Sequence, residues 1–317
     1  MGPNTHFEVM QALSLKKVLY LYRFIIPIKK MKRNFILALL CMTYSACNGQ
    51  ESLALRVASY NLRMDTKADR LNSWTYRKDK VNALILFHDI DILGTQEGFV
   101  HQLQDICSMP EYAYIGAGRD DGKTAGEHSA IIYKTARLEV LEKGDFWLSE
   151  TPDVPGKGWD ATCCNRICSW GKFKEKQSGK IFYFFSVHFD HQGIVARQES
   201  GKLMVVKIKE IAGSDPLICV GDFNSTPETE QMMLLSSAFN DAKAVSKMPP
   251  YGPEGTFTMR FGNPIGSERI DYIFVYNGID VLKYAGLTDN DGMYYPSDHI
   301  PVMADIIIKS GTNTIKK

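Results

Sequence analysis

Apolar and polar residues follow two different periods along the chain, and segments with the two periods alternate. At the start of residues 53–61, LALRVASYN, every second residue is apolar, which is typical of a strand with one buried face. In residues 74–88 the apolar positions recur at helical spacing instead, after Ser73, which can act as an N-cap. This alternation predicts a fold built from both helices and strands.

The same criteria predict the remaining elements. Further strands are expected at residues 90–97, 112–116, 129–134, 138–149, 167–173, 180–188, 216–224, 269–276 and 301–308. Helices are expected as a short stretch through Leu103 and Ile106, and at residues 194–211 and 228–236. No linker-like segment divides this series, so we expect one domain over residues 52–309, followed by a tail at 310–317.

Residues 31–47, MKRNFILALLCMTYSAC, have the composition of a secretory leader. A basic start precedes an apolar stretch that is too short to cross a bilayer, and small residues precede Cys47. We therefore expect residues 1–47 to be a leader, with Met31 as a plausible true start. The YSAC ending resembles a bacterial lipobox, so Cys47 is a candidate lipid anchor, and plain signal-peptidase cleavage is the alternative. An exported protein follows, either a cell-envelope lipoprotein or a periplasmic or secreted one.

Removing this leader changes the charge of the chain. The full sequence has a formal net charge of +1, but residues 1–47 hold seven Lys or Arg and one Glu, so the remainder carries −5. The remaining five cysteines are an odd number without a second Cys/His cluster, which predicts buried thiols, or at most one bridge, rather than a structural metal.

Polar residues repeatedly stand where the expected strands end. One such residue carries no information, but eight indicate that one rim of the sheets forms a site. These residues are Asn61, Glu97, His188, Asp190, Asp222, Asn224, Asp298 and His299.

The stretch SVHFDHQG, residues 186–193, allows three interpretations. It could be a zinc site, a proton-transfer site, or a polar strand end that reaches water. His188 and Asp190 project to the same side of a strand, whereas His191 is expected in the following turn. The two histidines therefore do not form a clamp on one strand face.

Six motifs in order make the chain similar to a known superfamily. They are SYN with Asn61, TQE with Glu97, VHFDH with His188, GDFNSTP with Asp222 and Asn224, RIDYIFV with Asp271, and SDHIP with Asp298 and His299. Together they resemble the endonuclease/exonuclease/phosphatase superfamily, with its deoxyribonuclease-I-like fold, over residues 53–308. The sequence looks closest to an uncharacterised bacterial branch of it, with some likeness to deadenylase-type members.

The resemblance implies a fold and a cofactor. The expected fold is an α/β (α+β) sandwich of two packed mixed β-sheets flanked by helices. The expected cofactor is Mg²⁺, with Mn²⁺ as the alternative, and Mg²⁺ prefers the oxygen ligands that the strand ends supply. Glu97 would be the principal metal ligand, and Asn61 a ligand or an amide that orients one.

The resemblance also implies roles in catalysis. Asp222 would position the attacking water, and Asn224 would donate to phosphate or fix Asp222. His299, held by Asp271 and next to Asp298, would be the other pole of the acid–base system. Whether Asp222 or His299 is the general base stays open.

The same resemblance gives His188 a role at the phosphate, so a zinc site is not expected there. His188 would contact phosphate or protonate the leaving group. Asp190 and His191 are candidates for the substrate rim. Arg197 could reach phosphate or be a helix-surface charge.

Three residues outside the motifs keep two interpretations. Glu127 and His128 precede a strand and could form a pocket wall or a solvated loop. Arg166 is equally open.

The function expected from the sequence is that of an exported, metal-dependent hydrolase of phosphate esters. We expect it to be a phosphodiesterase or phosphatase that acts as a monomer on a compact substrate. A secreted nuclease, a sphingomyelinase-like lipid phosphodiesterase and a non-enzymatic binding module are the alternatives. The net charge of −5 and the lack of a Lys/Arg run argue against long nucleic acid as a dedicated partner. Membrane contact is expected only through a lipid at Cys47.

Overall fold

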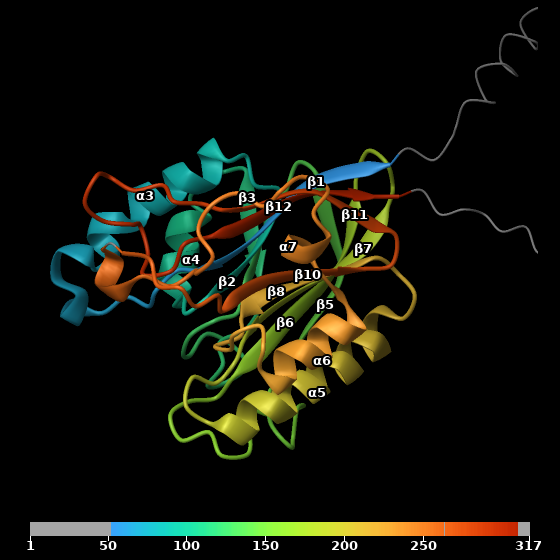
Figure 1. Ribbon diagram of the computed structural model, residues 1–317, viewed down its shortest axis with the longest axis horizontal. Helices are drawn as coiled ribbons and strands as arrows, with labels where there is room; N and C mark the ends of the chain where they lie inside the picture. Colours follow the sequence, from blue (N-terminus) through green and yellow to red (C-terminus); the bar gives the residue numbers. More distant parts are fainter. Residues whose placement is uncertain (1–51, 263, 310–317) are drawn as a thin grey trace, which may run out of the picture. The chain divides into compact units, whose positions relative to one another are not determined.

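Two six-stranded β-sheets pack face to face around the central core (Figure 1). The first sheet has the order β11 (Ile279–Gly286), β12 (Val302–Ile308), β1 (Leu53–Asn61), β2 (Ile92–Gln96), β4 (Ile131–Lys134) and β3 (Tyr112–Ile115). The second has the order β5 (Leu138–Trp147), β6 (Ile167–Glu175), β7 (Ile181–His188), β8 (Leu217–Asp222), β10 (Asp271–Tyr276) and β9 (Asn240–Asp241). Each sheet is mixed, because β1–β2 and β7–β8 pair in parallel and their other neighbours are antiparallel. The predicted sandwich of two mixed sheets is confirmed.

The computed structural model describes residues 52–262 and 264–309. The predicted leader, with Met31 and Cys47, and the predicted tail lie outside the described residues. None of the described helices is both long enough and apolar enough to cross a membrane.

The alternation of side chains along the strands fills three layers of core. On β1, Leu55 and Val57 face the second sheet, whereas Ala58 and Tyr60 face outward against helices. The outer face of the first sheet is covered by α3 (Trp74–Phe87) and α4 (Val100–Ile106). The outer face of the second is covered by α5 (Ile194–Ala212) and α6 (Glu230–Ala238), on the other side of the molecule in Figure 1. The shorter helices are α7 (Ala242–Val245) and two 3-10 turns, η1 (Lys67–Asn72) and η2 (Met259–Phe261).

Two local predictions differ from the structure. Ser73 stands at the N-cap of α3, but its side chain makes no capping bond, and the Trp74 N–H donates to Asp65 Oδ1 at 3.2 Å instead. The sequence pattern also missed β11. A bulge between Val281 and Lys283 breaks the two-residue period on which strand prediction depends.

The topology brings several strand ends to one edge of the sandwich. In the first sheet Asn61 pairs with Gln96, and in the second Asp222 pairs with both His188 and Asp271. Because parallel strands end at the same edge, the ends of β1, β2, β7 and β8 gather the polar residues that follow them. This edge carries the candidate site.

Candidate active site

Asn61 links the two sheets at this edge. Its side-chain amide donates to Glu97 Oε1 at 3.1 Å and to Asp222 Oδ2 at 3.0 Å. Its Oδ1 accepts the Arg63 N–H at 2.9 Å, and the residue is fully buried. Asn61 therefore fixes one carboxylate from each sheet relative to the other.

Glu97 stands just past the end of β2 in a strained backbone conformation. Its φ is 63°, in the left-handed region that side chains other than glycine seldom adopt. The Met64 N–H donates to Glu97 Oε2 at 3.1 Å, and Arg63 Nη1 lies 4.0 Å from the same oxygen. Burial raises the pKa of Glu97, but the positive charge of His299 and the hydrogen bonds of Asn61 and Met64 outweigh burial, so the pKa is lowered. The carboxylate is held ionised.

His299 and two aspartates form a buried acid–base chain. His299 Nδ1 lies 2.9 Å from Asp271 Oδ2, and His299 Nε2 lies 3.7 Å from Asp222 Oδ2. Burial lowers the pKa of His299, yet the charges of Asp271 and Asp222 raise it to about 10. Burial and the neighbouring Asp271 raise the pKa of Asp222 to about 7. At neutral pH the imidazole is therefore charged, and Asp222 is close to its titration point.

His188 contacts the same aspartate from the other side. His188 Nε2 lies 3.5 Å from Asp222 Oδ2. Burial, followed by the positive charge of Arg166, holds the pKa of His188 well below its usual value. This imidazole is neutral at physiological pH, in contrast to that of His299.

Asn224 and Asp298 complete the set of strand-end residues. The Asn224 backbone N–H donates to Asp222 Oδ1 at 2.9 Å, and its amide donates to Phe189 O at 3.0 Å. Asn224 thus fixes Asp222 through its backbone. Asp298 is buried, and its Oδ2 lies 3.7 Å from Arg63 Nε.

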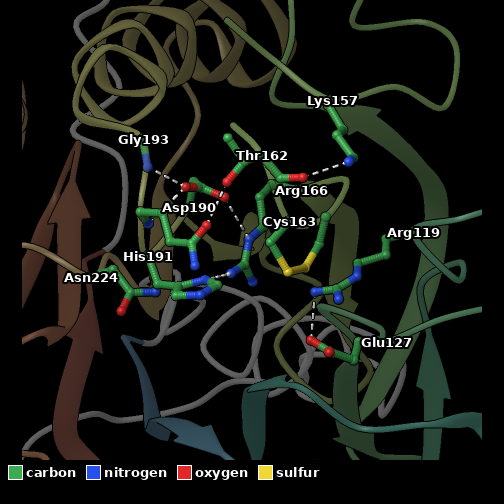
Figure 2. The surroundings of a disulfide bond; sticks show 12 residues. Arg119, Glu127, Lys157, Thr162, Cys163, Arg166, Asp190, His191, Gly193 and Asn224 are labelled. Atoms are coloured by element: carbon green, nitrogen blue, oxygen red, sulfur yellow. Dashed lines mark hydrogen bonds and ion pairs between the residues drawn. A yellow bond between two sulfur atoms is a disulfide. The ribbon is translucent and has the colours of Figure 1, made fainter. Parts of the chain in front are cut away.

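Asp190 and Arg197 have a different setting. Asp190 Oδ1 accepts the N–H groups of Gln192 and Gly193 at 2.8 and 2.6 Å, and Arg197 Nη1 donates to the Asp190 backbone oxygen at 3.3 Å. Both residues thereby hold the turn into α5. Figure 2 shows His191 on the inner side of this turn, where its Nδ1 lies 2.8 Å from Arg166 Nη2.

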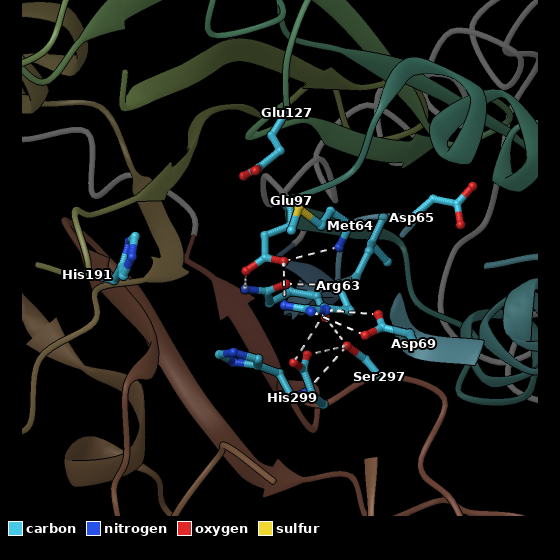
Figure 3. A network of polar contacts seen from close by, with 12 residues as sticks. Arg63, Met64, Asp65, Asp69, Glu97, Glu127, His191, Ser297 and His299 are labelled. Atoms are coloured by element: carbon cyan, nitrogen blue, oxygen red, sulfur yellow. Dashed lines mark hydrogen bonds and ion pairs between the residues drawn. The ribbon is translucent and has the colours of Figure 1, made fainter. Parts of the chain in front are cut away.

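Arg63, two residues past Asn61, was not among the site residues expected from the sequence. Figure 3 shows its guanidinium between Glu97 and Asp69, with Nε 3.0 Å from Asp69 Oδ2. The available signal was its place in the strand end YNLR. Glu127, His128 and Arg166 are all buried, so the interpretation of Glu127 and His128 as a solvated loop is wrong.

A pocket of about 610 Å³ lies next to Asp298, and Arg63 forms part of its wall. Four residues on its wall have positive φ, namely Arg63, Arg70, Arg260 and Phe261. The Phe257 ring, also on this wall, packs edge-on against the His299 ring with centroids 5.0 Å apart. Backbone strain concentrated around one cavity is typical of a binding site.

The donor chemistry of the edge fits a divalent cation. Glu97 and Asp298 offer carboxylate oxygen atoms, the ligand type that Mg²⁺ and Mn²⁺ prefer, whereas Asn61 turns its amide nitrogen to Glu97 and Asp222 and orients both carboxylates. A second group, Asp222, Asp271 and His299, has ligand atoms within 4.8 Å of one another and could also hold a metal. Within it, Asp271 Oδ1 is buried and has no hydrogen-bond partner in the part of the chain that the structure describes, but His299 is already paired with the other oxygen of Asp271.

Comparisons with known proteins show the family and the fold. Residues 58–299 match the sequence profile of the Endonuclease/Exonuclease/phosphatase family. A solved structure of a family member from Bacteroides thetaiotaomicron is 42% identical, with a TM-score of 0.78, and the match covers 82% of this chain and all of that one. The mannosyl-6-phosphatase Bt3783 from the same organism is 44% identical, with a TM-score of 0.75, and 80% of this chain matches 99% of that one. The uncharacterized protein L388 of Acanthamoeba polyphaga mimivirus is 27% identical over 75% of this chain and 94% of its own length. The chain therefore belongs to the endonuclease/exonuclease/phosphatase family of hydrolases, as the motifs in its sequence predicted.

Proposed function

We propose that this protein is an exported, divalent-metal-dependent phosphatase that removes the phosphate group from a compact phosphomonoester. The observation that carries the proposal is the buried network that joins Glu97, Asn61 and Asp222 across the two sheets and continues to His299 and Asp271. Such a constellation offers a cation site, a water-orienting carboxylate and a positive charge side by side, which are the components that attack on phosphorus requires.

Glu97, with Asp298, would hold the cation, which we assign as Mg²⁺ or Mn²⁺, and Asn61 would orient Glu97 through its side-chain amide. When bound, the cation would neutralise charge on the phosphate oxygens. His299 is not assigned as a ligand, because it is protonated at neutral pH and hydrogen-bonded to Asp271.

The sequence left open whether Asp222 or His299 is the general base, and the protonation states of the two residues favour Asp222. Asp222 would orient the attacking water and accept its proton, since a pKa raised to about 7 makes it a competent base near neutral pH. His299 already carries a proton and would stabilise negative charge on the phosphate instead. His188, being neutral, would donate a hydrogen bond to a phosphate oxygen rather than supply a proton to the leaving group.

The choice of a compact substrate rests on the pocket and on the charge of the chain. A pocket of about 610 Å³ suits a small alcohol such as a sugar. A net charge of −5 outside residues 1–47 disfavours a polyanion. The similarity to a protein named mannosyl-6-phosphatase supports a sugar phosphate as the substrate class.

The test compares five substrates with and without EDTA. Purified protein would be assayed on p-nitrophenyl phosphate, mannose 6-phosphate, bis-(p-nitrophenyl) phosphate, sphingomyelin vesicles and supercoiled plasmid. We expect cleavage of the two monoesters, loss of activity in EDTA, and recovery on adding Mg²⁺ or Mn²⁺.

The other outcomes identify the alternatives. Preferential cleavage of plasmid, falling steeply with salt, would establish a nuclease and overturn the proposal. Cleavage of sphingomyelin vesicles alone would establish a lipid phosphodiesterase. Binding of phosphate esters with no turnover under any metal would establish a binding module.

Export is proposed from the sequence of the leader, with Cys47 as the lipid-bearing residue. We expect the protein in the cell-envelope fraction after expression in a bacterium with its native leader, and incorporation of labelled palmitate that Cys47→Ser abolishes. Recovery of an uncleaved protein from the cytoplasm would contradict this.

A further inference from the structure

Two arginines from separate loops, the buried Arg166 and the partly buried Arg119, lie together beside the catalytic network. Arg166 immediately precedes β6, and Arg119 belongs to the loop between β3 and β4. The Arg119 backbone oxygen accepts hydrogen bonds from Trp147 Nε1 at 2.7 Å and Asn165 Nδ2 at 3.2 Å, so the two loops are fixed to each other. Figure 2 shows both guanidinium groups next to the disulfide between Cys163 and its sequence neighbour.

The hydrogen bonds of this arginine pair (Arg119 and Arg166) are incomplete. Arg166 is only 5% exposed, yet its Nε and Nη1 have no hydrogen-bond partner among the described residues, and the same holds for Arg119 Nε. Arg119 Nη1 donates to Glu127 Oε2 at 2.6 Å, whereas Asp190 Oδ2 is 3.7 Å from Arg166 Nε, beyond hydrogen-bond distance. A buried guanidinium with unused N–H groups is costly, and the cost disappears when an anion binds.

The arginine pair lies close to the catalytic network. In Figure 3 Glu127 lies above Glu97, and His191 lies to the left of Glu97 and above His299. Arg119 is hydrogen-bonded to Glu127 and Arg166 to His191, so each arginine is joined to one of these two neighbours of the network. The charges of both arginines also act on His188, which lies 3.5 Å from Asp222. The pair is therefore placed to act on a phosphate bound beside His188 and Asp222.

We propose that Arg166 binds the non-bridging oxygens of a dianionic terminal phosphate, positioned by Arg119, and thereby selects phosphomonoesters over phosphodiesters. This inference rests on the proposed phosphatase function and specifies its substrate class. A monoester presents three non-bridging oxygens and a charge near −2 at neutral pH. A diester has one oxygen fewer and half the charge, and its second ester group occupies the place of the missing oxygen. A guanidinium can hold two phosphate oxygens at once, which a lysine cannot.

The test compares a monoester and a diester in matched variants. Arg166→Met keeps most of the side-chain volume and removes the N–H groups, and Arg166→Lys keeps the charge without the fork. The control is Arg137→Ala. Arg137 immediately precedes β5, whose other end, Trp147, donates a hydrogen bond to the Arg119 backbone oxygen. The length of the strand therefore places Arg137 roughly 30 Å from the arginine pair.

For Arg166→Met we expect kcat/KM on p-nitrophenyl phosphate to fall about 100-fold. On bis-(p-nitrophenyl) phosphate it should change by less than about threefold. The inhibition constant of inorganic phosphate should rise at least tenfold in Arg166→Met. The constants of Arg166→Lys should lie between those of the wild type and those of Arg166→Met. The constants of Arg137→Ala should match those of the wild type. Equal losses on both substrates, or unchanged phosphate inhibition, would overturn the inference.

Phosphate binding also separates this inference from the proposed function. Inorganic phosphate should raise the melting temperature of the wild type and of Arg137→Ala, but not that of Arg166→Met. If the wild type cleaved neither substrate, the proposed function would fail, and this shift would still decide the role of Arg166. A variant that unfolds would be replaced by Arg166→Gln, and an equal shift in wild type and variant would contradict the proposal.

Discussion

The catalytic network and the arginine pair lie next to each other but are built in opposite ways. The network, which is Asn61, Glu97, Asp222, Asp271 and His299, stands at strand ends, and its members are hydrogen-bonded to one another across both sheets. The arginine pair stands on loops and keeps unused N–H groups. The members of one region hold one another in place, whereas the other region has N–H groups that a bound phosphate can satisfy.

This difference assigns the two regions to different tasks. A network whose geometry is fixed by the sheets can stabilise a transition state without reorganising, because its dipoles and charges are already in place. Guanidinium groups whose hydrogen bonds to the described residues are only partly made gain further hydrogen bonds from an anionic ligand. We therefore expect variants of the network to affect all substrates alike, and variants of the pair to discriminate between them.

The largest effect is expected from the network. Asp222→Asn and His299→Ala should each lower kcat about 1000-fold on monoester and diester alike, because each removes an acid–base or charge-stabilising group from the reacting centre. Steady-state kinetics on both nitrophenyl substrates, together with circular dichroism to establish folding, measure this.

The decisive quantity is the ratio of the loss of kcat on the monoester to the loss of kcat on the diester. A folded Asp222→Asn protein with near-native kcat would remove the residue from its assigned role. A loss restricted to the monoester would remove the distinction between the two regions.

Glu127 gives the next largest effect, on stability rather than rate. Burial raises the pKa of Glu127 to about 7, and the charge of Arg119 only partly offsets this. Between pH 4.5 and 7 the folded protein keeps this proton while the unfolded chain loses it, so the free energy of unfolding falls as pH rises. The fall amounts to about 3 kcal/mol. Glu127→Gln should not show this fall.

Urea unfolding at pH 4.5, 6 and 8 in EDTA, compared between wild type and Glu127→Gln, measures it. Other groups titrate in this range in both proteins, so the quantity of interest is the difference between the two curves. Parallel curves would mean that Glu127 is ionised throughout and fully neutralises Arg119.

Much of this architecture follows from the sequence, and what was missed has a physical pattern. Asn61, Glu97 and Asp222 were found because strand periodicity ends at or next to each of them, and His299 was found because its motif follows the others in family order. β11 was missed because a bulge interrupts its alternation. Where a strand's two-residue period ends, or where a bulge interrupts it, depends on the backbone and not on the chemistry of the site residues.

The arginine pair could not be predicted in the same way. Arg119 and Arg166 lie in loops 47 positions apart, and no period relates two loops that meet only through backbone and side-chain hydrogen bonds. The sequence also does not reveal that a single arginine is buried, because most arginines are exposed to solvent. For Arg166 the sequence therefore left both interpretations open.

Changing a cation ligand should have a smaller effect, on metal dependence. Glu97→Gln keeps the shape of the side chain but removes a hard anionic oxygen, so the Mg²⁺ concentration for half-maximal rate should rise 10- to 100-fold. Glu139→Gln, an exposed position on β5, serves as the control. An unchanged titration in Glu97→Gln would place the cation elsewhere, for example at Asp222 and Asp271.

The smallest effect is expected from the disulfide between Cys163 and Cys164, which precedes Arg166 by two residues. A bridge between sequence neighbours closes almost no loop in the unfolded chain, so the double variant to serine should cost about 1 kcal/mol of stability at most. Loss of the disulfide should instead affect the arginine pair. Without the bridge the loop can move more freely, so the Arg166 backbone is held less firmly. Substrate binding must then restore the position of the Arg166 side chain.

We expect a two- to fivefold rise in KM for p-nitrophenyl phosphate in this double variant, with kcat and the diester rate within error of the wild type. Treatment of the wild type with a reductant should reproduce the change, because Cys163 is exposed. Cys168→Ser, which alters a buried free thiol, separates loss of the bridge from loss of any cysteine. A fall in kcat on both substrates would mean that the loop supports the catalytic network itself, and that the two regions are not independent.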